Sequence, residues 1–228
     1  MSLSTLRNPV TLALLAAAPA WASALVLDDF SAGNITVTSS VGSTAGQNVP
    51  GVFGDNRGIL LLKEVEDSAT SVSVGAGVLT WNETGRDYAS VVYGTATTEQ
   101  DLSGYDAFRI DIVSAPPNAG TMDFTLWYRF GSNQNFGVTA TVAVPGSGLV
   151  DVPFASLRSV PSFPPLDLTR VGAIVIGFPG DTARLAPGTY VLDDFQAVLL
   201  APVPEPPAWA LAGLGALAVM LKRRRHAG

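Results

Sequence analysis

The chain has 228 residues, of which 47% are hydrophobic and 14% charged, and it contains no cysteine. The lack of cysteine excludes a disulfide framework, thiolate zinc sites and cysteine nucleophiles. The single histidine, His226, lies in a basic tail. Ser-His-Asp catalysis and histidine-ligated metals are therefore excluded from the rest of the chain.

The charge is unevenly distributed along the chain. Arg7 and the four residues from Lys222 to Arg225 account for five of the 13 basic residues, which leaves eight in residues 25–201. The same range holds 18 of the 19 acidic residues, because only Glu205 lies outside it, so its net charge is near −10. We expect no nucleic-acid partner, because phosphates would be repelled.

Residues 1–24 have the pattern of a secretory signal peptide. Arg7 supplies positive charge, residues 10–18 form a short apolar core, and Ala22-Ser23-Ala24 offers the small residues of a cleavage site. We expect passage through the Sec translocon and removal of this segment by signal peptidase. The alternative is a buried N-terminal helix.

Residues 202–228 combine three segments in a fixed order: a proline-rich stretch (202–207), an uncharged run (208–221) and a basic tail (222–228). A helix over the 14 residues of the run rises about 21 Å, somewhat less than the roughly 30 Å hydrocarbon core. Snorkelling of Lys222 narrows the difference, so we expect a single transmembrane helix at 208–221. The basic residues that orient it toward the cytoplasm are Lys222, Arg223, Arg224 and Arg225.

This end of the chain resembles the PEP-CTERM sorting signal of Gram-negative bacteria. The resemblance rests on Pro204, Glu205 and Pro206, the short apolar segment and the arginine-rich end. It implies processing by an exosortase near that motif. It also implies an inner-membrane-anchored precursor whose domain faces the periplasm, followed by release to the cell surface or the extracellular matrix. The alternative is a plain membrane anchor with a proline-rich stalk.

Residues 25–201 predict a single all-β domain. Short β-rich runs are divided by Gly, Pro, Asn and Asp, which is the pattern of an antiparallel β-sandwich. In residues 122–130, apolar residues alternate with Asp123, Trp127 and Arg129, and the turn 131–135 leads into a second alternating run, so the two form a β-hairpin. The run 171–178 is apolar on both faces and is expected at the centre of a sheet.

One short motif occurs near both ends of this domain, as Leu-Asp-Asp-Phe at 27–30 and again at 192–195. We expect the first and last strands to lie side by side. Together with the segment 101–109, these motifs resemble the galactose-binding-like jelly rolls of carbohydrate-binding modules. The resemblance implies a jelly-roll sandwich that binds polysaccharide.

The two motifs contribute four aspartates, Asp28, Asp29, Asp193 and Asp194, to neighbouring strands. Their charges would repel one another unless something offsets them. A structural Ca²⁺ ion is one candidate, because it takes six to eight oxygen ligands. An arginine or hydrogen bonds from loop amides would serve instead.

A second candidate site rests on the assumption that strands 106–113 and 121–130 are neighbours. Arg109 and Asp111 would then share an exposed surface with Asp123, Trp127 and Arg129. An exposed indole can stack on a sugar ring while the charged groups bond its hydroxyls. The alternative is a ladder of ion pairs with Trp127 packed under a loop.

These observations predict an exported surface or matrix protein whose sandwich is non-catalytic and binds or accompanies extracellular polysaccharide. A passive structural component that contacts other matrix proteins is the first alternative, favoured if no aromatic residue is exposed near 109–129. A glycoside hydrolase with paired carboxylates is the second, since it needs neither His nor Cys.

Overall fold

The computed structural model describes residues 24–38, 43–62, 70–84, 87–95, 97–130, 134–158, 163–178 and 186–200. The expected sorting signal at 202–228, its transmembrane helix included, and all but the last residue of the expected signal peptide lie outside these ranges. Within them, no helix is long and apolar enough to cross a membrane.

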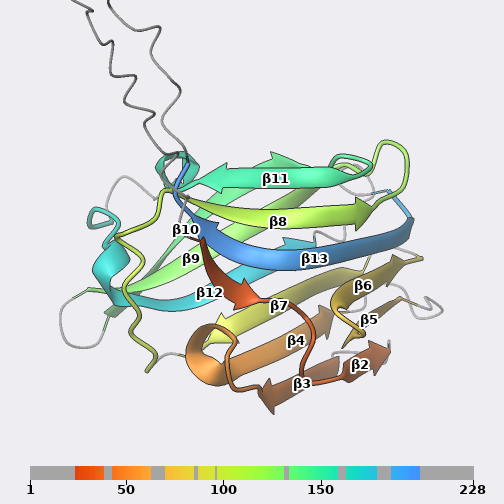
Figure 1. Ribbon diagram of the computed structural model, residues 1–228, viewed down its shortest axis with the longest axis horizontal. Coiled ribbons are helices and arrows are strands. Elements are labelled where there is room, and N and C mark those ends of the chain that lie inside the picture. Colours follow the sequence, from red (N-terminus) through yellow and green to blue (C-terminus); the bar gives the residue numbers. More distant parts are fainter. Residues whose placement is uncertain are drawn as a thin grey trace, which may run out of the picture.

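The described chain forms two antiparallel sheets packed face to face (Figure 1). Sheet A has the order β11 (Gly148–Pro153), β8 (Ala107–Ser114), β13 (Gly188–Val198), β6 (Val78–Glu83), β5 (Ser71–Gly75) and β2 (Ile35–Thr38), with β1 (Ala24–Asp28) paired to β13 as well. Sheet B has the order β10 (Gln134–Ala143), β9 (Thr121–Phe130), β12 (Val171–Phe178), β7 (Tyr88–Gly94), β4 (Asn56–Leu62) and β3 (Ser43–Asn48). The 3₁₀ turns are η1 (Phe53–Asp55), η2 (Phe154–Ser156) and η3 (Leu168–Arg170). This architecture confirms the predicted all-β jelly-roll sandwich.

The core lies between the sheets and is built by two-residue alternation along the strands. On β9, Phe124 and Leu126 are fully buried, while the residues between them face outward. Trp81 on β6 is also fully buried, and its ring lies 5.1 Å from that of Tyr190 and 4.4 Å from that of Phe178. The two inner faces therefore interlock through aromatic side chains contributed by both sheets.

The strand pairings confirm three predictions about where strands lie. β1 pairs with β13, so the first and last strands are neighbours. β9 and β10 form the predicted hairpin over ten residue pairs. β12 lies between β7 and β9, which explains why 171–178 is apolar on both faces.

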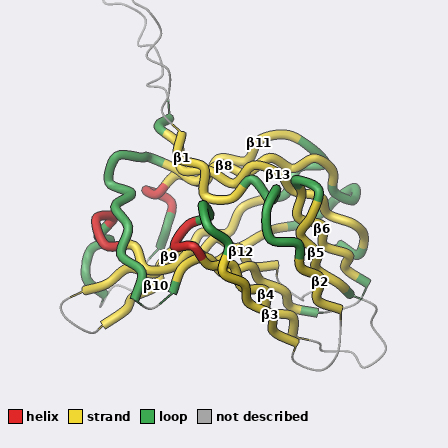
Figure 2. Tube along the Cα trace, turned by 60° about the horizontal axis from the view of Figure 1, so that its bottom comes forward, coloured by secondary structure: helices red, strands yellow, loops and turns green. Residues whose placement is uncertain are grey.

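The expected adjacency of β8 and β9 is wrong. β8 pairs with β11 and β13 in sheet A, whereas β9 pairs with β10 and β12 in sheet B. Residues 115–120 carry the chain from one sheet to the other, and the buried Ala119 lies within this crossing. Figure 2 shows the result, with β8 and β11 in one layer and β9 and β10 in the other.

Candidate functional site

The outer face of sheet B carries an exposed aromatic residue. Trp127 points outward from β9 and is 42% exposed. Its cross-strand partner on β10 is Gly137. A Cβ atom at that position would lie 3.2 Å from the indole atoms Cε2 and Cζ2, so the indole rests against the glycine and a larger side chain would displace it.

A hollow of about 320 Å³ opens beside this indole. It spans β10, β9, β12 and β7, and its walls are mostly apolar or uncharged: Val92, Thr95, Trp127, Asn135, Gly172, Ala173 and Val175. A second hollow of about 270 Å³ continues from Val92 over β4 and β3, where Gly46 and Gly58 contribute no side chain. Their volumes lie at or near the lower end of the range of small-ligand sites. We call the two hollows together the sheet B groove.

The floor of this groove follows the register of the sheet. One cross-strand row contains the lining residues Gly46, Gly58, Val92 and Val175 and continues to Thr125 and Thr139, so it crosses all six strands of sheet B. Five interstrand spacings make a row of about 24 Å. The groove thus runs across the strands, which suits a long ligand lying perpendicular to them.

Polar groups lie on β9 and β10, at one end of this row. The hydroxyls of Thr125 and Thr139 are 2.8 Å apart, and Thr141 donates a hydrogen bond of 2.6 Å to Asp123. These groups can bond ligand hydroxyls while the indole face stacks on an apolar C–H surface. No carboxylate lines the first hollow among the residues described.

Arg129 follows Trp127 on the same face of β9 and is held by Glu99. The Arg129 Nη1 atom lies 3.0 Å from Glu99 Oε1, and Arg170 Nη2 lies 2.9 Å from the same oxygen. The hydrogen bond from Arg170 is the main reason that the pKa of Glu99 is below its ordinary value. Both arginines therefore share one carboxylate beside the groove.

The predicted sugar platform is only partly assembled. Trp127, Asp123 and Arg129 share the outer face of sheet B, but Arg109 and Asp111 lie on the outer face of sheet A because β8 belongs to that sheet. Arg109 instead forms a bidentate ion pair with Asp151 of β11, at 2.6 and 2.8 Å. The prediction of one surface for all five residues is therefore wrong.

The four aspartates of the repeated motif also occupy different environments. Asp28 is buried, while Asp29 is exposed and accepts hydrogen bonds from the amide and hydroxyl of Ser31. Asp193 is half-buried and Asp194 is exposed, at a bulge in β13 where Asp194 has a φ of 51°. In the parts of the chain that the structure describes, no group of three or more acidic or histidine side chains could hold a metal ion. Calcium binding stays a prediction, tested by its effect on the melting temperature.

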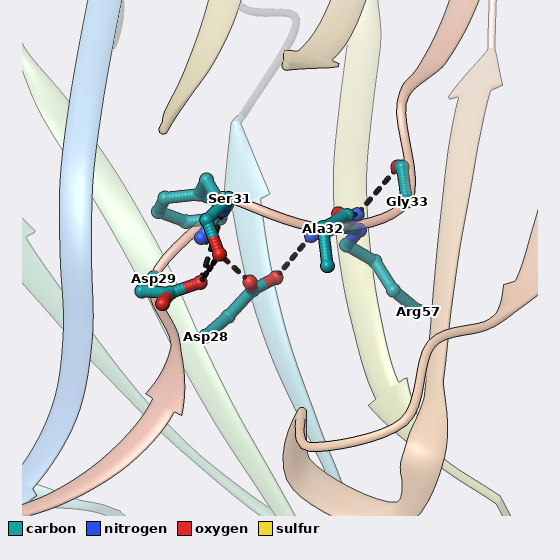
Figure 3. Close-up of polar contacts among 7 residues, drawn as sticks. Asp28, Asp29, Ser31, Ala32, Gly33 and Arg57 are labelled. Carbon is teal, nitrogen blue, oxygen red and sulfur yellow. Dashed lines mark hydrogen bonds and ion pairs between the residues drawn. The ribbon is translucent and has the colours of Figure 1, made fainter. Parts of the chain in front are cut away.

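The charge of Asp28 is offset by an arginine from the opposite sheet. Arg57 projects inward from β4, and its Nη1 atom lies 2.6 Å from Asp28 Oδ2 with both side chains fully buried (Figure 3). Its Nη2 atom donates to the carbonyls of Ala32 and Gly33. The amide of Phe30 donates to the other oxygen of Asp28. Of the alternatives left open by the sequence, an arginine and a turn amide are the partners found.

This cluster connects β1 and the turn that follows it to sheet B. Burial raises the pKa of Asp28 above its ordinary value, and the hydrogen bond and charge of Arg57 oppose that rise. Burial likewise raises the pKa of the nearby Tyr93 well above its ordinary value, and the Asp28 charge adds to this. The group is a structural clamp between the two sheets.

Sequence reasoning missed most of the groove lining. The usable signal was the run 171–178, because an outward face that is apolar, as at Ala173 and Val175, must be covered or must bind something. It also missed Arg57, although alternation with the buried Ile59 and Leu61 places this side chain inward.

A comparison with known protein families finds a sorting motif at the C-terminal end of the chain. Residues 202–225 match the PEP-CTERM protein-sorting motif, which confirms the resemblance inferred from Pro204, Glu205 and Pro206. The motif marks an exported protein that an exosortase handles at the membrane. No curated relative matches the chain.

Several solved structures resemble the sandwich. The family 11 carbohydrate-binding module of the cellulase Lic26A-Cel5E from Clostridium thermocellum is 15% identical, over 80% of this chain and 98% of the module, with a TM-score of 0.46. A structure of the family 11 module from that organism with a β-1,3-1,4-mixed-linked tetrasaccharide is 16% identical, over 78% and 96%, with a TM-score of 0.45. A cellulase derived from Cel12A of Rhodothermus marinus is 9% identical, over 73% and 100%, with a TM-score of 0.42.

Proposed function

We propose that this is an exosortase-sorted protein of the cell surface or extracellular matrix whose sandwich binds polysaccharide without catalysis, in the sheet B groove. The observation that carries the proposal is the exposed indole of Trp127 at the wall of an uncharged hollow that continues across six strands. An exposed aromatic face bordering a long, shallow groove suits a chain of sugar rings. The sorting motif supports export to the compartment where such polymers occur.

A neutral polymer, or a neutral stretch of one, fits this lining best. The residues around the two hollows carry no charge, and the nearby arginines share Glu99 rather than pointing at a free anion site. The mechanism is stacking on Trp127 with hydrogen bonds to Asn135, Thr95 and the Thr125–Thr139 hydroxyl pair. A glycoside hydrolase requires two carboxyl groups about 5–10 Å apart across the bound sugar. In the described ranges of the chain, the lining of the two hollows of the sheet B groove contains no carboxyl group.

Affinity electrophoresis in gels that contain the exopolysaccharide of the producing bacterium tests the proposal. We expect retardation of the wild-type protein and a loss of about five- to thirtyfold in affinity for Trp127→Ala, since stacking on one aromatic ring is worth about 1–2 kcal/mol. Leu149→Ala is the matched control, because Leu149 is 62% exposed on the opposite outer face and should leave retardation unchanged. Equal mobility of all three proteins with and without polysaccharide would favour the passive matrix component instead.

A further inference from the structure

The end of the last strand is fixed from both sides. In the register of sheet A, Val198 of β13 is the partner of Ala24 on β1 and of Ala107 on β8. The chain that leads to the sorting motif therefore leaves the sandwich from an inner strand. It leaves beside the start of the first strand.

Asp106 binds the end of β13 and the residues after it through both its backbone and its side chain. Its amide donates to the carbonyl of Val198 at 2.9 Å, and its own carbonyl accepts from the amide of Phe154 at 2.8 Å. Its Oδ2 atom accepts a hydrogen bond of 3.2 Å from the amide of Leu200. Asp106 thus holds the chain at a residue two positions past the end of β13.

Few residues separate Leu200 from the sorting motif in the sequence. The matched motif begins at residue 202, and Pro204 lies four residues beyond Leu200. Four extended residues span at most about 14 Å. A membrane-embedded processing enzyme must therefore engage Pro204-Glu205-Pro206 almost in contact with the folded sandwich.

We propose that Asp106 is a positioning residue for processing of the sorting signal. By holding Leu200, it limits how far from the sandwich the motif can lie. Without this bond, the last residue that a hydrogen bond of the described chain holds to Asp106 is Val198, so the upper limit on the distance to the motif rises by two residues, or about 7 Å. This inference goes beyond polysaccharide binding, because it concerns how the folded domain affects the processing of the sorting signal in the same chain.

The test shortens the sequence between Leu200 and Pro204 and then restores the maximum distance that it can span. Full-length precursor is expressed in the producing bacterium with residues 201–203 deleted, and the ratio of precursor to processed protein is followed by pulse-chase. We expect the deletion to slow processing at least tenfold, because it removes about 10 Å of reach. Adding Asp106→Ala should return the rate to within about threefold of the undeleted protein. Asp106→Asn, whose side-chain oxygen still accepts from Leu200, should not.

Two control variants distinguish loss of the Asp106–Leu200 hydrogen bond from general destabilisation of the domain. Asp101→Ala removes a similar bond in the same loop, where Asp101 accepts from the amide of Ser103 at 2.8 Å, away from the exit. Arg57→Met weakens the fold at the buried ion pair. Neither should rescue the deletion. Rescue by either control, failure of Asp106→Ala to rescue, or normal processing of the deletion alone would each overturn the proposal.

A second readout measures the bond itself. Hydrogen exchange at the Leu200 amide should be up to about tenfold faster in Asp106→Ala and unchanged in Asp106→Asn, the change expected for loss of one hydrogen bond. Faster exchange without rescue of processing would show that the bond exists and plays no part in positioning. Polysaccharide binding should be unaffected by every variant at Asp106, so the two proposals fail independently.

Discussion

Replacing Arg57 with methionine removes the positive charge that offsets the buried carboxylate of Asp28. The two side chains are fully buried, and the Nη1 to Oδ2 distance is 2.6 Å. Methionine fills much of the same volume but leaves Asp28 without a charged partner and the carbonyls of Ala32 and Gly33 without their donor. Breaking a buried pair by removing one partner typically costs about 3–5 kcal/mol. We therefore expect the free energy of unfolding to fall by about that amount.

Urea unfolding of the purified protein, with linear extrapolation to water, measures this loss. A loss of about 3–5 kcal/mol corresponds to a melting temperature lowered by roughly 6–20 °C for a domain of this size. Arg109→Met is the control, because the Arg109–Asp151 pair is about one-third exposed, at 31% and 35%, and an exposed pair contributes about 1 kcal/mol or less. Equal losses for the two variants, or a loss below about 1 kcal/mol for Arg57→Met, would refute the assignment of the clamp.

Two further predictions concern the buried phenol of Tyr190 and Gly137, which lies against the indole of Trp127. Burial raises the pKa of Tyr190 to about 12 from an ordinary 10.0. The stability that this shift contributes should therefore be complete below pH 10 and lost as the pH rises to 12. Thermal melts across that range should show this loss of stability, and Tyr190→Phe should make the loss smaller. A Cβ atom at Gly137 would lie 3.2 Å from the indole, so Gly137→Ala should shift the fluorescence of Trp127 and weaken polysaccharide retardation at least threefold, with the melting temperature changed by only a few degrees. Unchanged fluorescence and retardation would contradict the placement of the indole.

Local sequence patterns predict which way side chains face, and long-range pairing decides what they meet. The alternation in residues 122–130 correctly places Trp127 outward because a strand has a fixed two-residue period. The neighbours of that strand depend on how the chain crosses between sheets. Consecutive strands are adjacent in only about two-thirds of cases, and here residues 115–120 pass from sheet A to sheet B. The sequence therefore predicts the wrong surface for Arg109 and Asp111.

The buried clamp shows a second limit. Period-two alternation from Ile59 and Leu61 places Arg57 inward, but arginine is rarely buried without a partner, and the acidic residue nearest in sequence, Asp55, accepts from the Gly51 amide instead. Its partner, Asp28, is 29 residues away on the first strand. Edge strand β3 has little sequence signal for a different reason: Ser, Ala, Gly, Gln and Asn in residues 43–48 have little β-propensity, and the strand is held by pairing with β4.

The most direct measurement of the central claim is a chemical-shift map of the protein titrated with soluble oligosaccharides released from the producer's exopolysaccharide. We expect saturable shifts at the indole of Trp127 and at the amides of Val92, Ala173, Val175 and Asn135, all on the outer face of sheet B. Shifts confined to the outer face of sheet A, around Arg109 and Leu149, or none at saturating sugar, would contradict it.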